Sequence, residues 1–67
     1  MSKLAERLRE KRKKAGLTQK EVADQLGITR AAYTLYETDK CQPSLETITK
    51  IANLFETSID YLLGRYT

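Results

Sequence analysis

The sequence lacks the residues on which most metal sites and many catalytic sites depend. Its 67 residues include no histidine and a single cysteine, Cys41. Without histidine the commonest general base and metal ligand are missing, and one cysteine excludes an internal disulfide and a cysteine metal cluster. We therefore expect no catalytic residue, no metal and no cofactor, in a protein that is not an enzyme. The Cys41 thiol is either incidental or a redox switch in its loop.

Long apolar runs are also missing. No stretch approaches the roughly 20 apolar residues of a membrane-spanning helix, and the first residues are charged, unlike a signal peptide. We therefore expect a cytoplasmic protein with no membrane partner. A chain this short buries only about 60% of its unfolded surface, which leaves no room for a deep substrate cavity. We expect one domain over residues 1–67, with its core at about 4–64, and no small-molecule substrate.

Positive charge is concentrated at the N-terminal end. The chain carries a net charge of +3, yet residues 1–14 hold seven basic and two acidic side chains, so that the remaining residues carry −2. A basic segment on a mildly acidic body suits a polyanionic partner. The alternative is a solvated helix face on which Glu10 pairs with Lys14.

Apolar residues recur at helical spacing and nowhere alternate as in a strand. The pattern predicts an all-α fold: a compact five-helix domain with helices at about 3–14, 18–26, 29–37, 44–55 and 58–63. The side chains expected to face a single core are Leu4, Leu8, Ala15, Val22, Ala23, Leu26, Leu45, Ile48, Ile51, Ala52, Phe55, Ile59, Leu62 and Leu63, with Leu17 and Ile28 at the corners.

Residues 18–37, TQKEVADQLGITRAAYTLYE, carry the most specific pattern. Thr18 caps a first helix, Gly27 ends it with a left-handed turn, and Thr29 caps a second helix almost at once. Two helices joined by so tight a corner must cross steeply, and the small Ala23 lets them approach. This geometry is a helix-turn-helix, whose second helix can lie in the major groove of DNA.

The helix at 29–37 has two distinct faces. Tyr33 and Tyr36 are three residues apart and share one face, which we expect to point toward the core. The opposite face then carries Arg30, Ala31, Thr34 and Leu35.

The chain strongly resembles the phage-repressor/Cro helix-turn-helix family, also called the Xre family, from about Leu4 to Gly64. The likeness comprises the GLTQ…VA…LGIT run, the YE that ends the third helix, the PS that opens the fourth, and the IDYLLG ending. It implies a lambda-repressor-like fold with the helix-turn-helix formed by the second and third helices. The chain departs from the family where Thr38-Asp39 replaces the usual Asn-Gly, and at Leu35, where relatives often carry a polar residue.

The resemblance implies a sequence-specific regulator of transcription, most simply a repressor, that reads the major groove of double-stranded DNA with its third helix. Arg30 lies at the N-terminal end of that helix and would contact guanine, or alternatively a phosphate or solvent. Leu35 would contact a thymine methyl or be partly buried against the fourth helix. The full set implied for base contact is Arg30, Ala31, Leu35 and Thr34.

Phosphate contacts are expected around the helix N-termini, where free N–H groups favour anions. Gln19 resembles the family's phosphate-binding glutamine. Lys11, Lys13 and Lys14 would add longer-range attraction. The set expected to contact phosphate is Gln19, Thr29, Lys40, Gln42 and Ser44.

The resemblance further implies a partly buried salt bridge between Arg12 and Glu37, which would tie the first helix to the end of the third. It also implies a palindromic operator and a homodimer. The expected dimer interface is Tyr61, Leu62 and Tyr66, although the two tyrosines could instead cover the core or face solvent. The alternative function is a helix-turn-helix adaptor that binds proteins and has no specific DNA binding.

Overall fold

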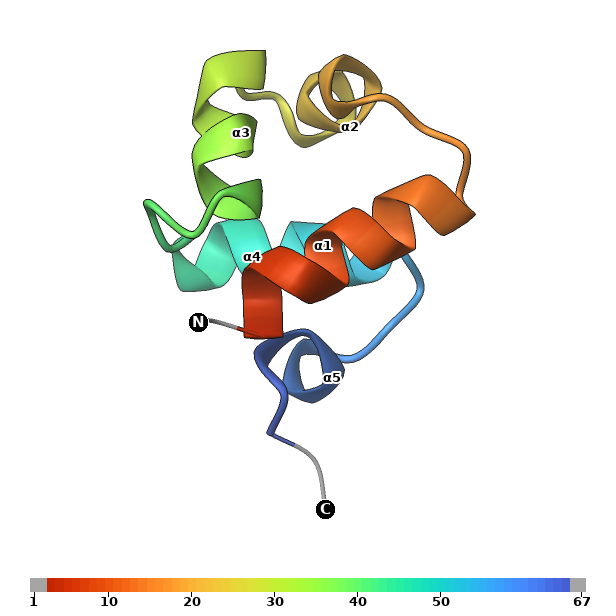
Figure 1. Ribbon diagram of the computed structural model, residues 1–67, viewed down its shortest axis with the longest axis vertical. Helices are drawn as coiled ribbons and strands as arrows, with labels where there is room; N and C mark the ends of the chain where they lie inside the picture. Colours follow the sequence, from red (N-terminus) through yellow and green to blue (C-terminus); the bar gives the residue numbers. More distant parts are fainter. Residues whose placement is uncertain (1–2, 66–67) are drawn as a thin grey trace.

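A hydroxyl side chain precedes four of the helices and starts each one where the sequence predicts. Thr18, Thr29, Ser44 and Ser58 each accept a hydrogen bond from the backbone N–H three residues later, which satisfies a donor of the first helical turn. The computed structural model describes residues 3–65, and within them it contains five helices and no strand (Figure 1). They are α1 (Lys3–Lys14), α2 (Gln19–Leu26), α3 (Arg30–Glu37), α4 (Leu45–Leu54) and α5 (Ile59–Leu63).

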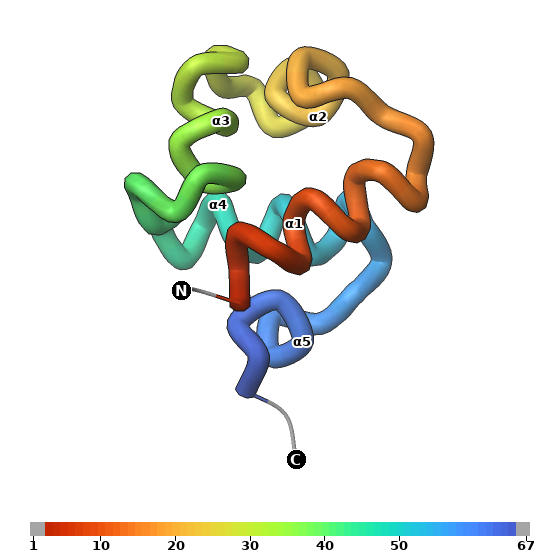
Figure 2. Tube along the Cα trace, in the orientation of Figure 1, coloured from red at the N-terminus to blue at the C-terminus, as the bar shows by residue number. Residues whose placement is uncertain are grey.

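A tight corner joins α2 to α3. Gly27 takes the left-handed φ of 75°, and the next N–H, that of Ile28, bonds back to the carbonyl of Ala23 at 3.0 Å. Ala23 is fully buried, which lets the two helices approach closely. In Figure 2 the axis of α3 lies in the plane of the picture, while α2 is viewed nearly down its axis. The two helices therefore cross steeply, as the sequence predicts.

The core lies where the five helices meet. The long α1 packs against α3 on one side and α5 on the other, while α4 packs against α5 and α2. Leu8, Val22, Tyr33, Ile51 and Leu62 are fully buried at this centre. The two corner residues pack against the core and are partly buried, as expected; they are Leu17 and Ile28.

Two residues expected in the core are exposed. Ala15 follows the last residue of α1, Lys14, and so lies beyond the helical face that continues from Leu8. Ala5 is buried in that face instead. Leu45 is the first residue of α4 and is 76% exposed, whereas Ile48, one turn further along the helix, is buried. Helical spacing predicts a face, but not where neighbouring elements stop covering it.

Among residues 3–65, two other than glycine adopt a left-handed backbone. Asp39 has a φ of 63° and Glu56 a φ of 53°, a region where a Cβ atom crowds the backbone. Asp39 stands where the family has glycine, so the substitution retains the turn at some strain. Glu56 ends α4 in the same way: its N–H bonds to Asn53, and the N–H of Thr57 bonds to Ala52.

Replacing Glu56 by glycine should therefore stabilise the fold. Removing the Cβ relieves strain on the order of 1 kcal/mol, partly offset by the greater freedom of glycine in the unfolded chain. We expect thermal melts of Glu56→Gly to show a higher melting temperature than wild type. Glu56→Ala retains the Cβ and should show no such gain; an equal gain in both variants would contradict the strain argument.

Candidate nucleic-acid interface

The outward face of α3 is largely exposed, and only Thr34 on it is partly covered. Tyr33 is fully buried, and Tyr36 is half-buried against it with ring centroids 6.4 Å apart in an edge-to-face arrangement. Arg30 and Ala31 on the other side are exposed. Leu35 is 42% exposed, which favours an outward position over burial against α4. The tyrosines thus anchor α3 to the core and leave its other side available.

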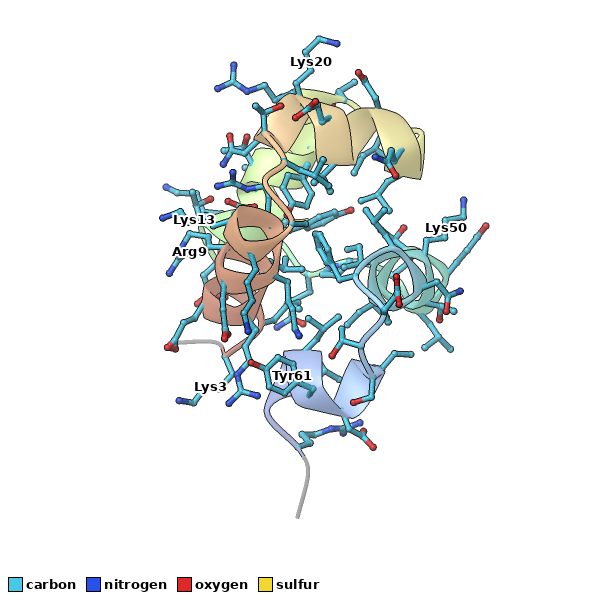
Figure 3. The ribbon with its side chains drawn as sticks, turned by 90° about the vertical axis from the view of Figure 1, so that its right-hand side faces the viewer. Lys3, Arg9, Lys13, Lys20, Lys50 and Tyr61 are labelled. Atoms are coloured by element: carbon cyan, nitrogen blue, oxygen red, sulfur yellow. The ribbon has the colours of Figure 1, made fainter. Side chains whose placement is uncertain are left out.

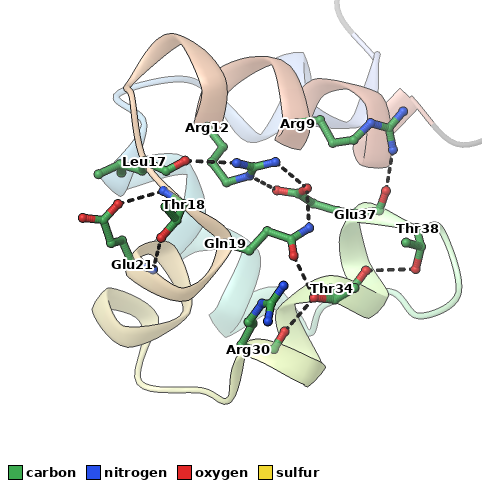
Figure 4. A network of polar contacts seen from close by, with 10 residues as sticks. All are labelled: Arg9, Arg12, Leu17, Thr18, Gln19, Glu21, Arg30, Thr34, Glu37 and Thr38. Atoms are coloured by element: carbon green, nitrogen blue, oxygen red, sulfur yellow. Dashed lines mark hydrogen bonds and ion pairs between the residues drawn. The ribbon is translucent and has the colours of Figure 1, made fainter.

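An ion pair between Arg12 and Glu37 holds α3 to α1. Arg12 Nε donates to Glu37 Oε2 at 2.7 Å and Nη2 donates to Oε1 at 3.2 Å. The third guanidinium nitrogen, Nη1, donates to the Leu17 carbonyl at 3.0 Å. The Glu37 side chain is 1% exposed and that of Arg12 15%. The pair implied by the resemblance is therefore present, and it also holds the turn between α1 and α2 (Figure 4).

The pair keeps both partners charged. Burial acts to raise the pKa of Glu37, but hydrogen bonds led by the one from Arg12 outweigh it, so the pKa lies below its usual value. The hydrogen bond to Glu37 raises the pKa of Arg12 against an opposing effect of burial. Beneath the pair, burial first and then the Glu37 carboxylate raise the pKa of Tyr33, so that its hydroxyl stays neutral.

A chain of hydrogen bonds runs from this pair to the outward face of α3. Gln19 Nε2 donates to Glu37 Oε1 at 3.1 Å, and Thr34 Oγ1 donates to Gln19 Oε1 at 3.2 Å. Both ends of the Gln19 amide therefore bond within the protein, and one N–H remains for the phosphate contact expected of this residue. No sequence pattern indicated this bridge, although Gln19 begins α2 where α2 and α3 cross.

The arginines of the basic segment also hold the fold together. Arg9 donates to the backbone carbonyl of Glu37. Arg7 donates to the carbonyl of Tyr61 at 2.8 Å and its guanidinium lies 4.1 Å from the centre of the Tyr61 ring. Lys13 and Lys14, by contrast, are exposed at the end of α1; Figure 3 shows Lys13 on the same side of α1 as Arg9.

The other residues expected at phosphates lie at helix starts and in the loop before α4. Lys40 and Gln42 are exposed in that loop. The hydroxyl oxygens of Thr29 and Ser44 cap α3 and α4, and Ser44 also donates to Thr47. An open depression lies at the N-terminus of α2, lined by Arg12, Gly16, Leu17, Thr18, Gln19, Lys20 and Arg30.

One residue of the expected dimer interface, Leu62, needs correction. Leu62 is fully buried, because it lies on the face of α5 that packs into the core, and so it cannot contact a second chain. Tyr61 is half-buried: Arg7 lies over its ring and its hydroxyl donates to Glu10 at 2.9 Å. Tyr66 lies outside the described residues.

The described residues contain no cluster of potential metal ligands. Within residues 3–65, moreover, every helix falls short of the length and apolar character needed to cross a bilayer.

Comparison with known proteins connects this geometry to a family. The model of the family described as "Helix-turn-helix" matches residues 8–62. The chain is 47% identical over 62 residues to the transcriptional regulator ImmR of Bacillus subtilis, which covers 92% of this chain and 49% of ImmR. It is 42% identical over 64 residues to the phage CTXphi transcriptional repressor RstR of Vibrio cholerae, covering 96% of this chain and 57% of RstR. The chain thus spans about half the length of the curated relatives it matches.

A solved structure has the same fold over nearly all of both chains. The P22 c2 repressor, in complex with a synthetic operator, superposes with a TM-score of 0.88 at 27% sequence identity. The match covers 94% of this chain and 96% of that one, so the lambda-repressor-like arrangement expected from the sequence is confirmed.

Removing the Glu37 carboxylate should strongly destabilise the fold. Glu37→Ala leaves the guanidinium of Arg12 largely buried without its partner, at an expected loss of about 3 kcal/mol in unfolding free energy. In a domain of this size that corresponds to a melting temperature lower by roughly 15 °C. Asp24→Ala, which breaks the exposed pair with Lys20, should change stability by less than about 0.5 kcal/mol. Equal losses in the two variants would contradict a special role for the buried pair.

The same pair should make stability depend on pH in acid. Because the pKa of Glu37 is lower in the folded than in the unfolded state, its contribution is complete above the unfolded value of about 4.3 and is lost as pH falls through the folded value. Urea titrations should show that the unfolding free energy of wild type exceeds that of Glu37→Gln most near neutral pH. This difference in unfolding free energy should shrink below about pH 4. A difference that stays constant down to about pH 3 would count against the ionised pair.

Proposed function

Because this chain belongs to the helix-turn-helix family of phage-repressor and Cro type, we propose that it is a sequence-specific DNA-binding regulator of transcription, and specifically a repressor. The observation that carries the proposal is the outward face of α3, on which Arg30, Ala31 and Leu35 are exposed. The protein acts by occupying DNA, without catalysis, metal or cofactor. Since its partner is DNA, we place it in the cytoplasm.

In this mechanism α3 enters the major groove. Arg30, the first residue of α3, presents donors that match the O6/N7 edge of guanine, an interaction worth roughly 1–3 kcal/mol of discrimination. Ala31 and Leu35 can offer only apolar contact, and the partly exposed Leu35 side chain would leave water against a thymine methyl. The buried Tyr33 on the opposite side keeps this orientation.

Phosphates on either side of the groove would position the domain. The first turns of α2 and α4 carry backbone N–H groups that lack intrahelical partners and favour anions. Lys20 and the remaining N–H of Gln19 lie at the first of these, and Lys40 and Gln42 at the second. Thr29 keeps its hydroxyl proton as a donor while its oxygen caps α3. These contacts carry no sequence information and weaken steeply with salt.

A palindromic operator read by a homodimer completes the proposal. One α3 reaches only part of a helical turn, and two copies one turn apart give the specificity that a single helix does not. Because Leu62 is buried, the interface would keep Tyr61 and Tyr66 from the expected set and would need further contacts. Leu45 is the most exposed large apolar side chain of the described residues, at 76%, and it is our candidate contact for the second copy.

The test is a selection from randomised duplexes at two salt concentrations. We expect wild type to enrich paired half-sites and Arg30→Ala to relax the preference at one position per half-site, by roughly 1–3 kcal/mol. Lys50→Ala is the matched control: it also removes one positive charge, and Figure 3 shows Lys50 pointing away from Lys13, on α4. The control should leave the preferred sequence unchanged.

A uniform loss of affinity in Arg30→Ala, with the same preferred sequence, would assign Arg30 to phosphate. If wild type enriches no sequence and its association with DNA does not depend on salt, the proposal fails, and an adaptor that binds proteins becomes the better account.

A further inference from the structure

The hydroxyl of Thr34 has one proton and two neighbouring acceptors inside the protein. Its oxygen, Oγ1, lies 2.9 Å from the backbone carbonyl of Arg30 and 3.2 Å from Gln19 Oε1. A hydroxyl carries a single donor and two lone pairs. Whichever of the two acceptors takes the proton, the hydroxyl has no donor left for a molecule outside the protein.

The ion pair fixes the orientation of the Gln19 amide, and with it the acceptor that faces the Thr34 hydroxyl. Glu37 is ionised and can only accept hydrogen bonds, so the amide nitrogen of Gln19 must face it and the amide oxygen must face Thr34. Arg12 holds the Glu37 carboxylate in turn through two hydrogen bonds. The buried ion pair therefore determines which end of an amide reaches the outward face of α3.

We propose that Thr34 is a specificity-determining residue that reads the major groove as a hydrogen-bond acceptor. This inference rests on the proposed function. An acceptor pairs with the exocyclic amino group of adenine (N6) or cytosine (N4), and not with the N7, O6 or O4 acceptors of the groove. Arg30, one turn earlier on the same face, can only donate. The helix thus presents a donor and an acceptor one turn apart, facing base edges of opposite polarity.

The first experiment repeats the duplex selection with three proteins. Thr34→Val keeps the shape of the side chain and removes the hydroxyl, whereas Thr34→Ser keeps the hydroxyl. Wild type and Thr34→Ser should prefer the same base pair at one position per half-site, and Thr34→Val should relax the preference there alone. Thermal melts establish that each variant folds, and Thr34→Ala, with its higher helix propensity, serves the same purpose as Thr34→Val if the latter is unstable.

The second experiment removes single atoms from the base at that position. Purine in place of adenine, or 2-pyrimidinone in place of cytosine, deletes the amino group, and a 7-deaza purine deletes the N7 acceptor. Loss of the amino group should weaken wild-type binding roughly threefold to tenfold, as expected for one hydrogen bond. Thr34→Val should bind the operator without the amino group as tightly as it binds the unmodified operator. The 7-deaza purine should change the affinities of wild type and Thr34→Val by the same factor.

The outcomes separate the two proposals. Sequence-specific binding by wild type with no altered position in Thr34→Val, or with coupling of Thr34 to N7 in place of the amino group, overturns the acceptor role and leaves the proposed function intact. Failure of wild type to select any sequence overturns both.

Discussion

The buried ion pair of Arg12 and Glu37 is the interaction on which the rest of the structure depends. It joins α1 to the last residue of α3, and it also bonds to the Leu17 carbonyl, just before α2, and to Gln19, the first residue of α2. A buried pair of this kind adds little net stability compared with apolar residues of the same size, because both charges must leave water. Its contribution here is geometric. The two charged groups keep their hydrogen bonds only when α1, α2 and α3 meet in this arrangement, so the pair fixes how the three helices pack.

That constraint explains how so short a helix can present a binding surface. An eight-residue helix such as α3 is not stable alone in water. Tyr33 buries its inner face and Glu37 ties its end, so the orientation of the outward face follows from the core. The same network continues through Gln19 to Thr34, which means that the hydrogen-bonding character of the surface is set from inside the domain.

Local features of this fold could be predicted from the sequence, and features that depend on distant elements could not. The caps at Thr18, Thr29, Ser44 and Ser58 act within one turn, so they place the helix starts correctly. The spacing of Tyr33 and Tyr36 likewise gives the correct inner face of α3. Whether Leu45 or Leu62 is covered depends on where other helices end. The Gln19 bridge depends on how closely α2 and α3 approach, and the Arg12–Glu37 pair was expected only because the chain resembles a family.

The most direct test of the central claim is a double-mutant cycle on the ion pair, with Arg12→Met, Glu37→Leu and the two combined, measured as unfolding free energy. Each single variant leaves a buried charge without its partner, whereas the double variant leaves neither. The account predicts that the double variant recovers much of the stability lost by the single ones, with a coupling energy of about 2 kcal/mol or more. Losses that simply add would contradict it and show that pairing of these two charges does not hold α3 in place.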